Sequence, residues 1–325
     1  MQARVVRMAA QGGPEVMKLE NVSLAEPSAG EVLVRQTAVG VNYLDVYHRS
    51  GYYPLSMPSG VGSEAAGVVE RVGPGVTDLK PGDRVGYAGG PPGSYASHRL
   101  MPADRLVKIP DGVSDETAAA VMLKGMTVEY LLQRCYPVKR GDAVLFYAAA
   151  GGVGLLAGQW GSHLGAKMIG VTSGPEKGAL ARAHGYAEVI DRTREDIVER
   201  VKAVTGGAGV PVVYDSVGKA TFDASIKSLR PRGCFVSFGT TTGAPPPVEA
   251  GLLQKLGSLY FTRPTLATYT ASRDDLVSSA AAVFDMLKRG ALNVHIGARY
   301  PLADASRAHA DLEAGKTVGS SLLVP

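Results

Sequence analysis

The sequence has few cysteines, and they lie far apart. Cys135 and Cys234 are the only two in 325 residues, about 100 positions from each other. So small a number excludes a disulfide framework, and the spacing excludes a cysteine metal motif. We therefore expect both to be small buried hydrophobic residues in a protein of the reducing cytoplasm.

The chain also has no basic cluster and no apolar segment near its start. Its net charge is only +4, and no run of lysine and arginine stands out. We therefore expect no nucleic-acid partner. Residues 1–19 carry early charges and no apolar core of the length that a secretory signal needs, so we expect no export.

One long stretch lacks ionised side chains, which raises the question of a membrane span. From Ala143 to Ala166 there is no Asp, Glu, Lys or Arg. Five glycines before residue 162, together with Gln159 and Ser162, argue against a membrane helix. We predict a buried strand followed by a partly buried helix, and no membrane partner.

The centre of this stretch has the pattern of a dinucleotide-binding turn. Apolar and aromatic residues at 144–147 predict a strand, a glycine cluster follows, and apolar residues then return at helical spacing. In a βαβ unit such a turn lays backbone N–H groups against a pyrophosphate, and the helix N-terminus adds its positive dipole end. Gly151 would allow this close approach, and Gly154 would let helix and strand pack closely. The residues predicted to hold the pyrophosphate are Ala150, Gly151, Gly152, Val153 and Gly154.

Strands and helices alternate after this turn, which predicts a doubly wound parallel sheet. A last apolar strand at 258–261 suits a sheet edge that pairs with a second subunit, so we expect a homodimer. The other expected strands are 167–171, 188–190, 211–215 and 233–238, and the helices between them are 176–184, 194–204 and 220–229.

The first third of the chain is rich in strands and turns. Residues 1–110 alternate between apolar and polar side chains at strand period, which predicts a small barrel-like unit. A helix is expected from Asp115 to Cys135 with Ser114 as its cap. Gly125 lowers helix stability, so we predict a break or a close backbone approach between Lys124 and Thr127.

The ribose end of the predicted cofactor site has no acidic residue on its strand. NAD-binding enzymes place a carboxylate about 20 residues past the glycines, but this chain has Val171-Thr172-Ser173-Gly174 there and no acid before Glu176. Lys177 lies just beyond, and Arg192 follows the third strand. Ser173, Lys177 and Arg192 are therefore predicted to surround a 2′-phosphate, which favours NADPH over NADH. The alternative is that both basic side chains are solvated surface charges.

Motifs spread over the whole chain resemble those of one superfamily. They are Gly40–Asp45 with Tyr47, Gly62–Gly67, Pro81–Val85, Leu123–Thr127, Ala148–Gly154, Val213–Gly218 and Gly319–Leu323. Together they resemble the medium-chain dehydrogenases/reductases, and among these the zinc-free quinone oxidoreductases related to ζ-crystallin. The resemblance implies an α/β protein with a GroES-like β-rich catalytic domain at 1–123, a Rossmann cofactor domain at 124–265, and a segment at 266–325 that returns to the catalytic domain.

The same resemblance bears on metal. Zinc enzymes of the superfamily place thiolate and imidazole ligands where this chain has Asn42 and Ser63, and their four closely spaced structural cysteines are missing here. Without a Lewis acid to stabilise an alkoxide, alcohol oxidation is not expected. A quinone needs less help because the charge it accepts is delocalised. The resemblance thus implies NADPH-dependent reduction of a quinone without a metal, by one or two electrons.

The resemblance also assigns residues to the site. It places Asn42, Tyr47 and Tyr53 along the nicotinamide and quinone, with Lys124 and Thr127 beside them. For the cofactor the resemblance adds Ser216, Phe238, Thr240 and Lys316. Arg192 stands at a position where relatives often carry tyrosine.

Each assignment has a structural alternative. The tyrosines could simply cover the core with their hydroxyl groups in water, and Asn42 could make ordinary turn bonds. Asp45 and Glu64 are expected to be partners for basic groups rather than an acid–base pair.

Two other functions are compatible with these residues. The scaffold also suits an NADPH-dependent reductase of enones or enoyl thioesters. A protein that binds NADPH with negligible turnover is the other alternative.

Overall fold

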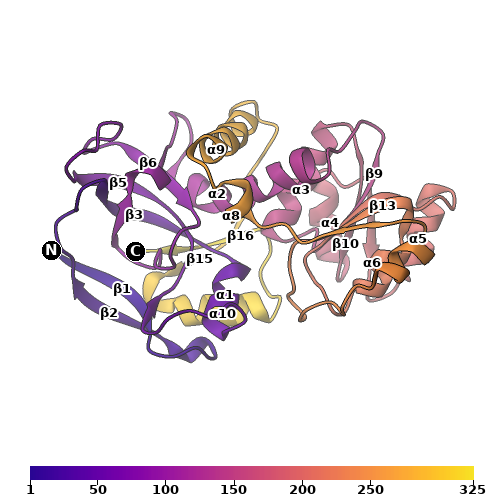
Figure 1. Ribbon diagram of the computed structural model, residues 1–325, viewed down its shortest axis with the longest axis horizontal. Coiled ribbons are helices and arrows are strands. Elements are labelled where there is room, and N and C mark those ends of the chain that lie inside the picture. The colour runs from indigo at the N-terminus through magenta and orange to yellow at the C-terminus, as the bar shows by residue number, and fades with distance from the viewer. The chain divides into compact units, whose positions relative to one another are not determined.

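The chain is divided into two structural units, each built from more than one segment. The computed structural model describes residues 1–325 (Figure 1). Unit 1 consists of Met1–Met126, Tyr269–Gly290 and Val294–Pro325. Unit 2 consists of Thr127–Thr268 and Ala291–Asn293.

Unit 2 contains a sheet of six parallel strands in the order β11-β10-β9-β12-β13-β14. Counted along the chain, this is the 3-2-1-4-5-6 order of the Rossmann fold, so the predicted doubly wound sheet is confirmed. The central strands β9 and β12 are almost wholly apolar and buried, as parallel strands covered on both faces must be. The strands are β9 (Ala143–Tyr147), β10 (Lys167–Thr172), β11 (Glu188–Asp191), β12 (Val210–Asp215), β13 (Leu229–Ser237) and β14 (Tyr260–Thr262).

Helices cover both faces of this sheet (Figure 1). Helix α3 packs against α4 and β10, whereas α5 packs against α6, which lies on β12 and β13. Between the layers, Leu145, Ile169, Val213 and Phe235 belong to one apolar core. No helix of the chain combines the length and hydropathy that crossing a membrane would require. The helices are α3 (Gly152–His163), α4 (Pro175–Ala183), α5 (Ile197–Thr205), α6 (Phe222–Lys227), α7 (Ala250–Lys255) and α8 (Leu266–Tyr269).

Unit 1 is built mainly from strands. Its larger sheet has seven strands, β15-β16-β3-β5-β6-β8 with β7 also paired to β3, and its smaller sheet has the order β2-β1-β4. Val34, Val39, Tyr87 and Leu323 belong to the core of this unit. The strands are β1 (Gln2–Met8), β2 (Met17–Ser23), β3 (Glu31–Val41), β4 (Ser59–Gly60), β5 (Glu64–Val72), β6 (Arg84–Ala88), β7 (His98–Pro102), β8 (Val107–Lys108), β15 (Ile296–Pro301) and β16 (Ser320–Val324).

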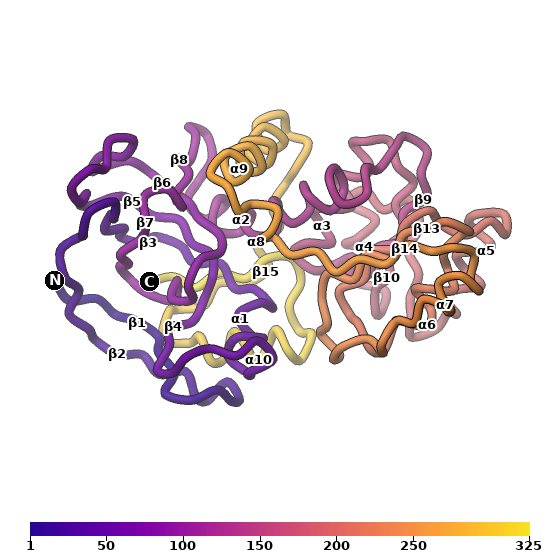
Figure 2. Tube along the Cα trace, viewed as in Figure 1, coloured from indigo at the N-terminus to yellow at the C-terminus, as the bar shows by residue number.

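The last strand of the chain lies inside the larger sheet of unit 1. Strand β16 pairs in parallel with β15 and antiparallel with β3, where Leu322 lies opposite Gly40. Figure 2 shows the yellow C-terminal trace within the unit formed by the indigo and purple N-terminal segments. Residues from the two ends of the chain therefore complete one sheet.

Helix α2 corrects part of the sequence prediction. It runs from Asp115 to Glu129 without interruption, so of the two alternatives predicted for Lys124–Thr127 the break does not occur. The close approach is confirmed, because a Cβ atom on Gly125 would lie 2.8 Å from Val283 Cγ1 of α9. The helical geometry changes only after Glu129, where Tyr130–Cys135 form a π-helical segment. The other helices of unit 1 are α1 (Tyr43–Ser50), α9 (Arg273–Lys288) and α10 (Ala305–Glu313).

Candidate functional site

The glycine turn of unit 2 joins the carboxyl end of β9 to the first turn of α3. Ala148 has a positive φ of 53°, and Gly151, the residue before the helix, is extended. No side chain caps α3, and its first turn carries no acidic residue. The N–H groups at the start of a helix have no acceptor within the helix, so this end offers uncapped donors to an anion.

The two outer glycines of the turn have different surroundings. A Cβ atom on Gly154 would lie 2.3 Å from Ala148 O and 2.7 Å from Ala149 C, so the packing of β9 against α3 requires glycine there. A Cβ atom on Gly151 would meet only Ala148 O, at 3.2 Å. The protein's own packing thus leaves the space beside Gly151 open, which fits a pyrophosphate lying over bare backbone.

The ribose end of the site lies where β10 and β11 finish. Thr172 and Asp191 are paired in register, and Arg192 N donates to Thr172 O at 3.1 Å. Thr172 Oγ1 is buried without a hydrogen-bond partner. Lys177 lies partly buried in the first turn of α4, and Arg192 is exposed, so both predicted cations lie near this edge.

Sequence reasoning missed a carboxylate at the same edge. Asp191 Oδ1 accepts a hydrogen bond of 3.1 Å from Gly174 N, next to the predicted Ser173. The strand that precedes Ser173 indeed carries no acid, but the neighbouring strand supplies one. Its signal in the sequence was an acidic residue at the end of the third predicted strand.

The loops after β12 and β13 bring together three more predicted residues. Phe238 N donates to Asp215 O at 2.8 Å, and Thr241 N donates to Ser216 O at 3.2 Å. Thr240 is buried in the same loop. The two loops pack so closely that a Cβ atom on Gly239 would lie 2.5 Å from Ser216 O. Ser216, Phe238 and Thr240 therefore share the carboxyl edge of the sheet.

Asp215 fixes these loops and was not predicted. Its Oδ2 accepts from Thr221 Oγ1 at 2.7 Å and from Ser225 Oγ at 2.6 Å. Its Oδ1 accepts from the backbone N–H of Val217 at 2.7 Å and of Gly218 at 3.1 Å. The completely buried carboxylate thus holds the turn that presents Ser216.

In unit 1, helix α1 presents a group of tyrosines. The ring of Tyr47 lies 5.4 Å from that of Tyr53, so the structure brings the two predicted tyrosines together. Tyr43 and Tyr52 complete the group at 5.2 Å and 5.1 Å from Tyr47, and sequence reasoning missed both. The helical spacing of Tyr43 and Tyr47 and the adjacency of Tyr52 and Tyr53 were the available signals. Tyr52 is more exposed than its neighbour Tyr53, with 43% of its surface accessible.

Asn42 begins α1 and connects it to a buried carboxylate. Its backbone N–H donates to Asp45 Oδ2 at 2.9 Å, and its Nδ2 donates to Glu64 Oε2 at 2.8 Å. Glu64 is fully buried and also accepts from Leu123 N at 2.6 Å and from Lys124 Nζ at 3.1 Å. The prediction that Glu64 is a partner for a basic group is therefore confirmed, and Lys124 is that group.

The corresponding prediction for Asp45 is wrong. Its carboxyl group forms no ion pair but accepts hydrogen bonds from Ser63 Oγ at 2.9 Å and Tyr95 Oη at 3.1 Å, besides Asn42 N. Tyr95 Oη also lies 2.8 Å from His309 Nε2. The ammonium group of Lys124 is bonded to Glu64 and not to Asp45. The phenol of Tyr95 therefore links Asp45 to His309.

Asp45 and His309 titrate in opposite directions. Burial raises the pKa of Asp45 from 3.8 to about 7. Burial, helped by the positive charge of Arg49, lowers the pKa of His309 from 6.5 to about 3. Between about pH 4 and 6.5 folding therefore takes up a proton at Asp45 and releases one from His309, and the two contributions to the pH dependence of stability oppose each other.

Single substitutions should separate these contributions. In Asp45→Asn only the His309 contribution remains, so the free energy of unfolding should fall as the pH is lowered from 6.5 toward 4. In His309→Asn it should rise over the same range, and either slope should reach at most about 1.4 kcal/mol per pH unit. Urea unfolding at several pH values measures both slopes. Slopes of the same sign in the two variants would contradict the assignment.

Asn42 and Ser63, which stand where the zinc enzymes of the resembled superfamily place metal ligands, form hydrogen bonds in this structure. Asn42 and Ser63 donate to Glu64 and Asp45, as described. No three His, Cys, Asp or Glu side chains are grouped in a way that could hold a metal ion. The side chains at these positions therefore stabilise α1 and the start of β5 through hydrogen bonds.

The two remaining predicted residues lie in different units. Thr127 is buried on α2 and belongs to unit 2. Lys316 lies between α10 and β16 in unit 1, with its largely exposed Nζ 3.8 Å from Asp311 Oδ1. Lys316 is thus available to solvent and only loosely paired.

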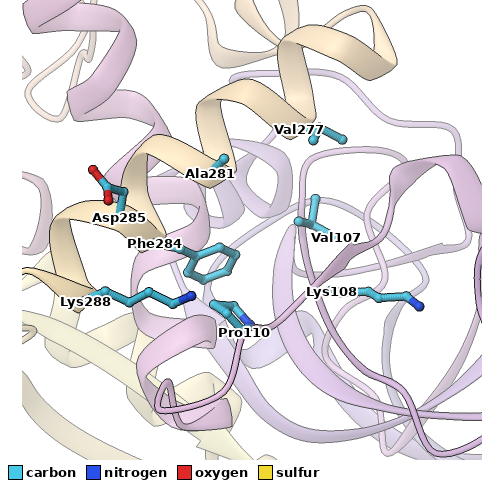
Figure 3. A pocket seen from close by; sticks show the side chains of 8 residues that line it. All are labelled: Val107, Lys108, Pro110, Val277, Ala281, Phe284, Asp285 and Lys288. Atoms are coloured by element: carbon cyan, nitrogen blue, oxygen red, sulfur yellow. The ribbon is translucent and has the colours of Figure 1, made fainter.

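A separate hollow of about 270 Å³ lies in unit 1 between β8 and α9 (Figure 3). Phe284 and Pro110 form part of its apolar wall, and Lys108, Asp285 and Lys288 are its charged residues. Lys108 is already paired with Asp83 at 2.9 Å. None of the predicted site residues lines it, so we do not assign the site to this hollow.

Two family models match the chain. The model described as "Alcohol dehydrogenase GroES-like domain" matches residues 28–111, and the model described as "Zinc-binding dehydrogenase" matches residues 152–286. The first match lies in unit 1, whereas the second begins at Gly152, within the glycine turn of unit 2, and ends in the Tyr269–Gly290 segment of unit 1.

Individual relatives match over nearly the whole chain. The chain is 48% identical to a quinone oxidoreductase of Pseudomonas aeruginosa, over 99% of this chain and 100% of that protein. It is 43% identical to a 2-haloacrylate reductase of a Burkholderia species, over 97% of each. The crystal structure of Escherichia coli quinone oxidoreductase complexed with NADPH matches with a TM-score of 0.97 at 45% identity, over 99% of this chain and 100% of that one.

Proposed function

Because the chain belongs to the quinone oxidoreductase family of the medium-chain dehydrogenases/reductases, we propose that it reduces quinones with NADPH and without zinc. The observation that carries the proposal is the glycine turn between β9 and α3, with open space over Gly151 and an uncapped helix N-terminus. In a sheet of this strand order, that turn is where a dinucleotide binds.

Unit 2 is proposed to bind the cofactor. When bound, NADPH supplies the hydride that reduces the acceptor. The backbone from Ala150 to Gly154 binds the pyrophosphate, and Ser173, Lys177 and Arg192 bind the adenosine end. Ser216, Phe238 and Thr240 orient the other end through the loops that Asp215 fixes.

Unit 1 is proposed to bind the acceptor. Tyr47 and Tyr53 supply aromatic faces for a flat quinone ring, and Asn42 supplies an amide beside them. Lys124 neutralises Glu64, so that the buried carboxylate does not repel the negative charge that the quinone gains. Thr127 belongs to the same helix as Lys124. No side chain of this group is proposed as a nucleophile, because the acceptor takes up hydride without a covalent bond to the protein.

Oxidation of NADPH with a panel of acceptors tests the function. The panel contains 1,4-benzoquinone, 9,10-phenanthrenequinone, an enone and crotonyl thioester, and the loss of reduced nicotinamide absorbance is followed with NADPH and with NADH. We expect the largest kcat/KM with a quinone and NADPH. Metal analysis of the same sample accompanies the assay. Activity that depends on bound zinc, or no turnover with any quinone, would contradict the proposal.

Reduction of an activated carbon–carbon double bond is the second candidate. The relative named 2-haloacrylate reductase, at 43% identity, favours it. In the same panel this function predicts that the enone exceeds both quinones in kcat/KM. Binding of NADPH with no turnover of any acceptor would instead favour a protein that only holds the cofactor.

A homodimer is proposed to form through strand β14. This strand is one edge of the sheet, and Tyr260 on it is 64% exposed, whereas the other edge, β11, carries Glu188 and Asp191. An apolar edge can pair with its copy. Light scattering should give the mass of a dimer, and Tyr260→Asp should shift it toward the monomer. The control Glu188→Lys should leave the mass unchanged, and a monomeric wild type would contradict the proposal.

A cytoplasmic location is proposed as well. The chain has only two cysteines, about 100 positions apart, which agrees with a reducing compartment. Fractionation of the source cells, with the protein detected by antibody, tests this.

A further inference from the structure

Asp191 is bonded in a way that the proposed function does not explain. It ends β11, and its Oδ1 accepts three hydrogen bonds, from Gly174 N at 3.1 Å, Thr193 N at 3.0 Å and Thr193 Oγ1 at 2.7 Å. One carboxylate oxygen therefore fixes both the turn after β10 and the turn after β11.

The other carboxylate oxygen has only a distant charged partner. Asp191 Oδ2 lies 4.0 Å from Arg194 Nε, and the Arg194 side chain is 75% exposed. The hydrogen bonds from Thr193 and Gly174 lower the pKa of Asp191, so the carboxyl group carries a negative charge at neutral pH. Oδ2 therefore remains a charged acceptor with free lone pairs.

The position of Asp191 relates this charge to the ribose. In a sheet of this order the ribose of the adenosine lies beyond the end of the second strand, which here is β10. Asp191 is in register with Thr172, the last residue of β10, and contacts the backbone of the next turn at Gly174. The first charged residues after β10 are Glu176 and Lys177, and Asp191 and Arg192 follow at the end of β11, so this edge carries two anions and two cations, of which Asp191 is the one that contacts the turn after β10.

We propose that Asp191 is a specificity-determining residue that lets the site accept NADH besides NADPH. Its Oδ2 accepts a hydrogen bond from a ribose hydroxyl group, and its charge repels a 2′-phosphate and so offsets part of the attraction of Lys177 and Arg192. Through Oδ1 it also positions the Ser173–Gly174 turn. This inference rests on the proposed cofactor, and it concerns the balance between the two forms of that cofactor.

The experiment measures nucleotide binding without an acceptor. Isothermal titration calorimetry gives the Kd of 2′,5′-ADP and of 5′-ADP for the wild type and for Asp191→Asn, which keeps Oδ1 as an acceptor but removes the charge. We expect Asp191→Asn to tighten 2′,5′-ADP by about tenfold, as expected for removing one partly screened charge a few ångströms from a phosphate. Asp191→Asn should bind 5′-ADP as tightly as the wild type does, or more weakly.

Two further variants separate charge from position. Thr193→Val removes the hydroxyl bond to Oδ1 and should weaken both nucleotides by a similar factor. Glu195→Gln removes a nearby carboxylate that accepts from Asp191 N at 2.9 Å and is paired with Arg200 at 2.7 Å, so the ratio of the two Kd values should not change. In each variant, the ratio of the KM values for NADPH and NADH should change in the same direction as the ratio of the Kd values for 2′,5′-ADP and 5′-ADP.

The outcomes distinguish this inference from the proposed function. Equal changes in both Kd values in Asp191→Asn, while the wild type binds 2′,5′-ADP, would overturn the role of Asp191 and leave the proposed function intact. A wild type that binds neither nucleotide would overturn both.

Discussion

Replacing Gly154 with alanine is expected to destabilise unit 2 by about 3 kcal/mol, because the added carbon has no space. Its Cβ atom would lie 2.3 Å from Ala148 O and 2.7 Å from Ala149 Cα, and all these neighbours are backbone atoms. These atoms belong to the short turn between β9 and α3, which cannot yield without moving α3 away from β9. Thermal and urea unfolding measure the loss.

Gly151→Ala should change stability little but weaken nucleotide binding. Its Cβ atom would meet only Ala148 O, at 3.2 Å, so the free energy of unfolding should fall by less than about 1 kcal/mol. The methyl group would, however, occupy the space proposed for the pyrophosphate, so binding of 2′,5′-ADP should weaken by at least about tenfold, or 1.4 kcal/mol. Gly251→Ala, in α7 with nothing within 4 Å, is the control and should change neither quantity much. Unaltered binding in Gly151→Ala would exclude the turn as the phosphate site.

Lys124→Met is the second substitution expected to have a large effect, about 3–5 kcal/mol of lost stability. The side chains of Lys124 and Glu64 are 7% and 0% exposed, and Nζ lies 3.1 Å from Oε2. Without the ammonium group the buried carboxylate keeps only the donors Asn42 Nδ2 and Leu123 N. A hypothetical Cβ on Gly40 would lie 2.2 Å from Glu64 Oε2, so the carboxylate already lies against the backbone of β3.

A second variant tests whether charge is the cause. Lys124→Met combined with Glu64→Gln removes both charges and should recover at least half of the loss, since no uncompensated charge remains buried. The shift in the urea midpoint of both single variants and of the double variant gives the coupling energy. Binding of 2′,5′-ADP serves as the control, because its proposed site lies in unit 2. If the double variant is less stable than Lys124→Met, the uncompensated charge is not the cause.

The sequence predicted the parts of this structure that depend on local pattern. The strand, glycine turn and helix around Gly151 are contiguous in the chain, and a fully apolar strand before a glycine cluster has few alternative structures. The alternation that follows predicts a doubly wound parallel sheet, because consecutive parallel strands need right-handed crossovers, but it does not determine the order of the strands. The π-helical segment Tyr130–Cys135 had no such local signal.

Contacts between distant segments could not be predicted in this way. Glu64 and Lys124 are 60 residues apart, and His309 meets Tyr95 from the far end of the chain. Asp191 reaches Gly174 only because β10 and β11 pair in one particular register. Sequence patterns indicate which strand a residue ends, but they do not indicate which neighbour's turn that residue will contact.

Helix starts were also less certain than helix existence. The helix predicted from Arg194 begins at Ile197, because Asp196 accepts a hydrogen bond from Glu199 N and so caps it. The residues between Asp191 and Asp196 instead form the turn in which Thr193 and Glu195 bond to Asp191. The local bonds of short polar side chains thus delayed the helix by three residues.

The place of β16 between β15 and β3 has a consequence for synthesis on the ribosome. Strand β3 is synthesised early, but its neighbour β16 follows all the other strands in the sequence, so the N-terminal third must wait with an open edge until β16 has been made. All six strands of the parallel sheet are synthesised between β3 and β16. The domain encoded in the middle of the gene can therefore fold before the one encoded at its beginning.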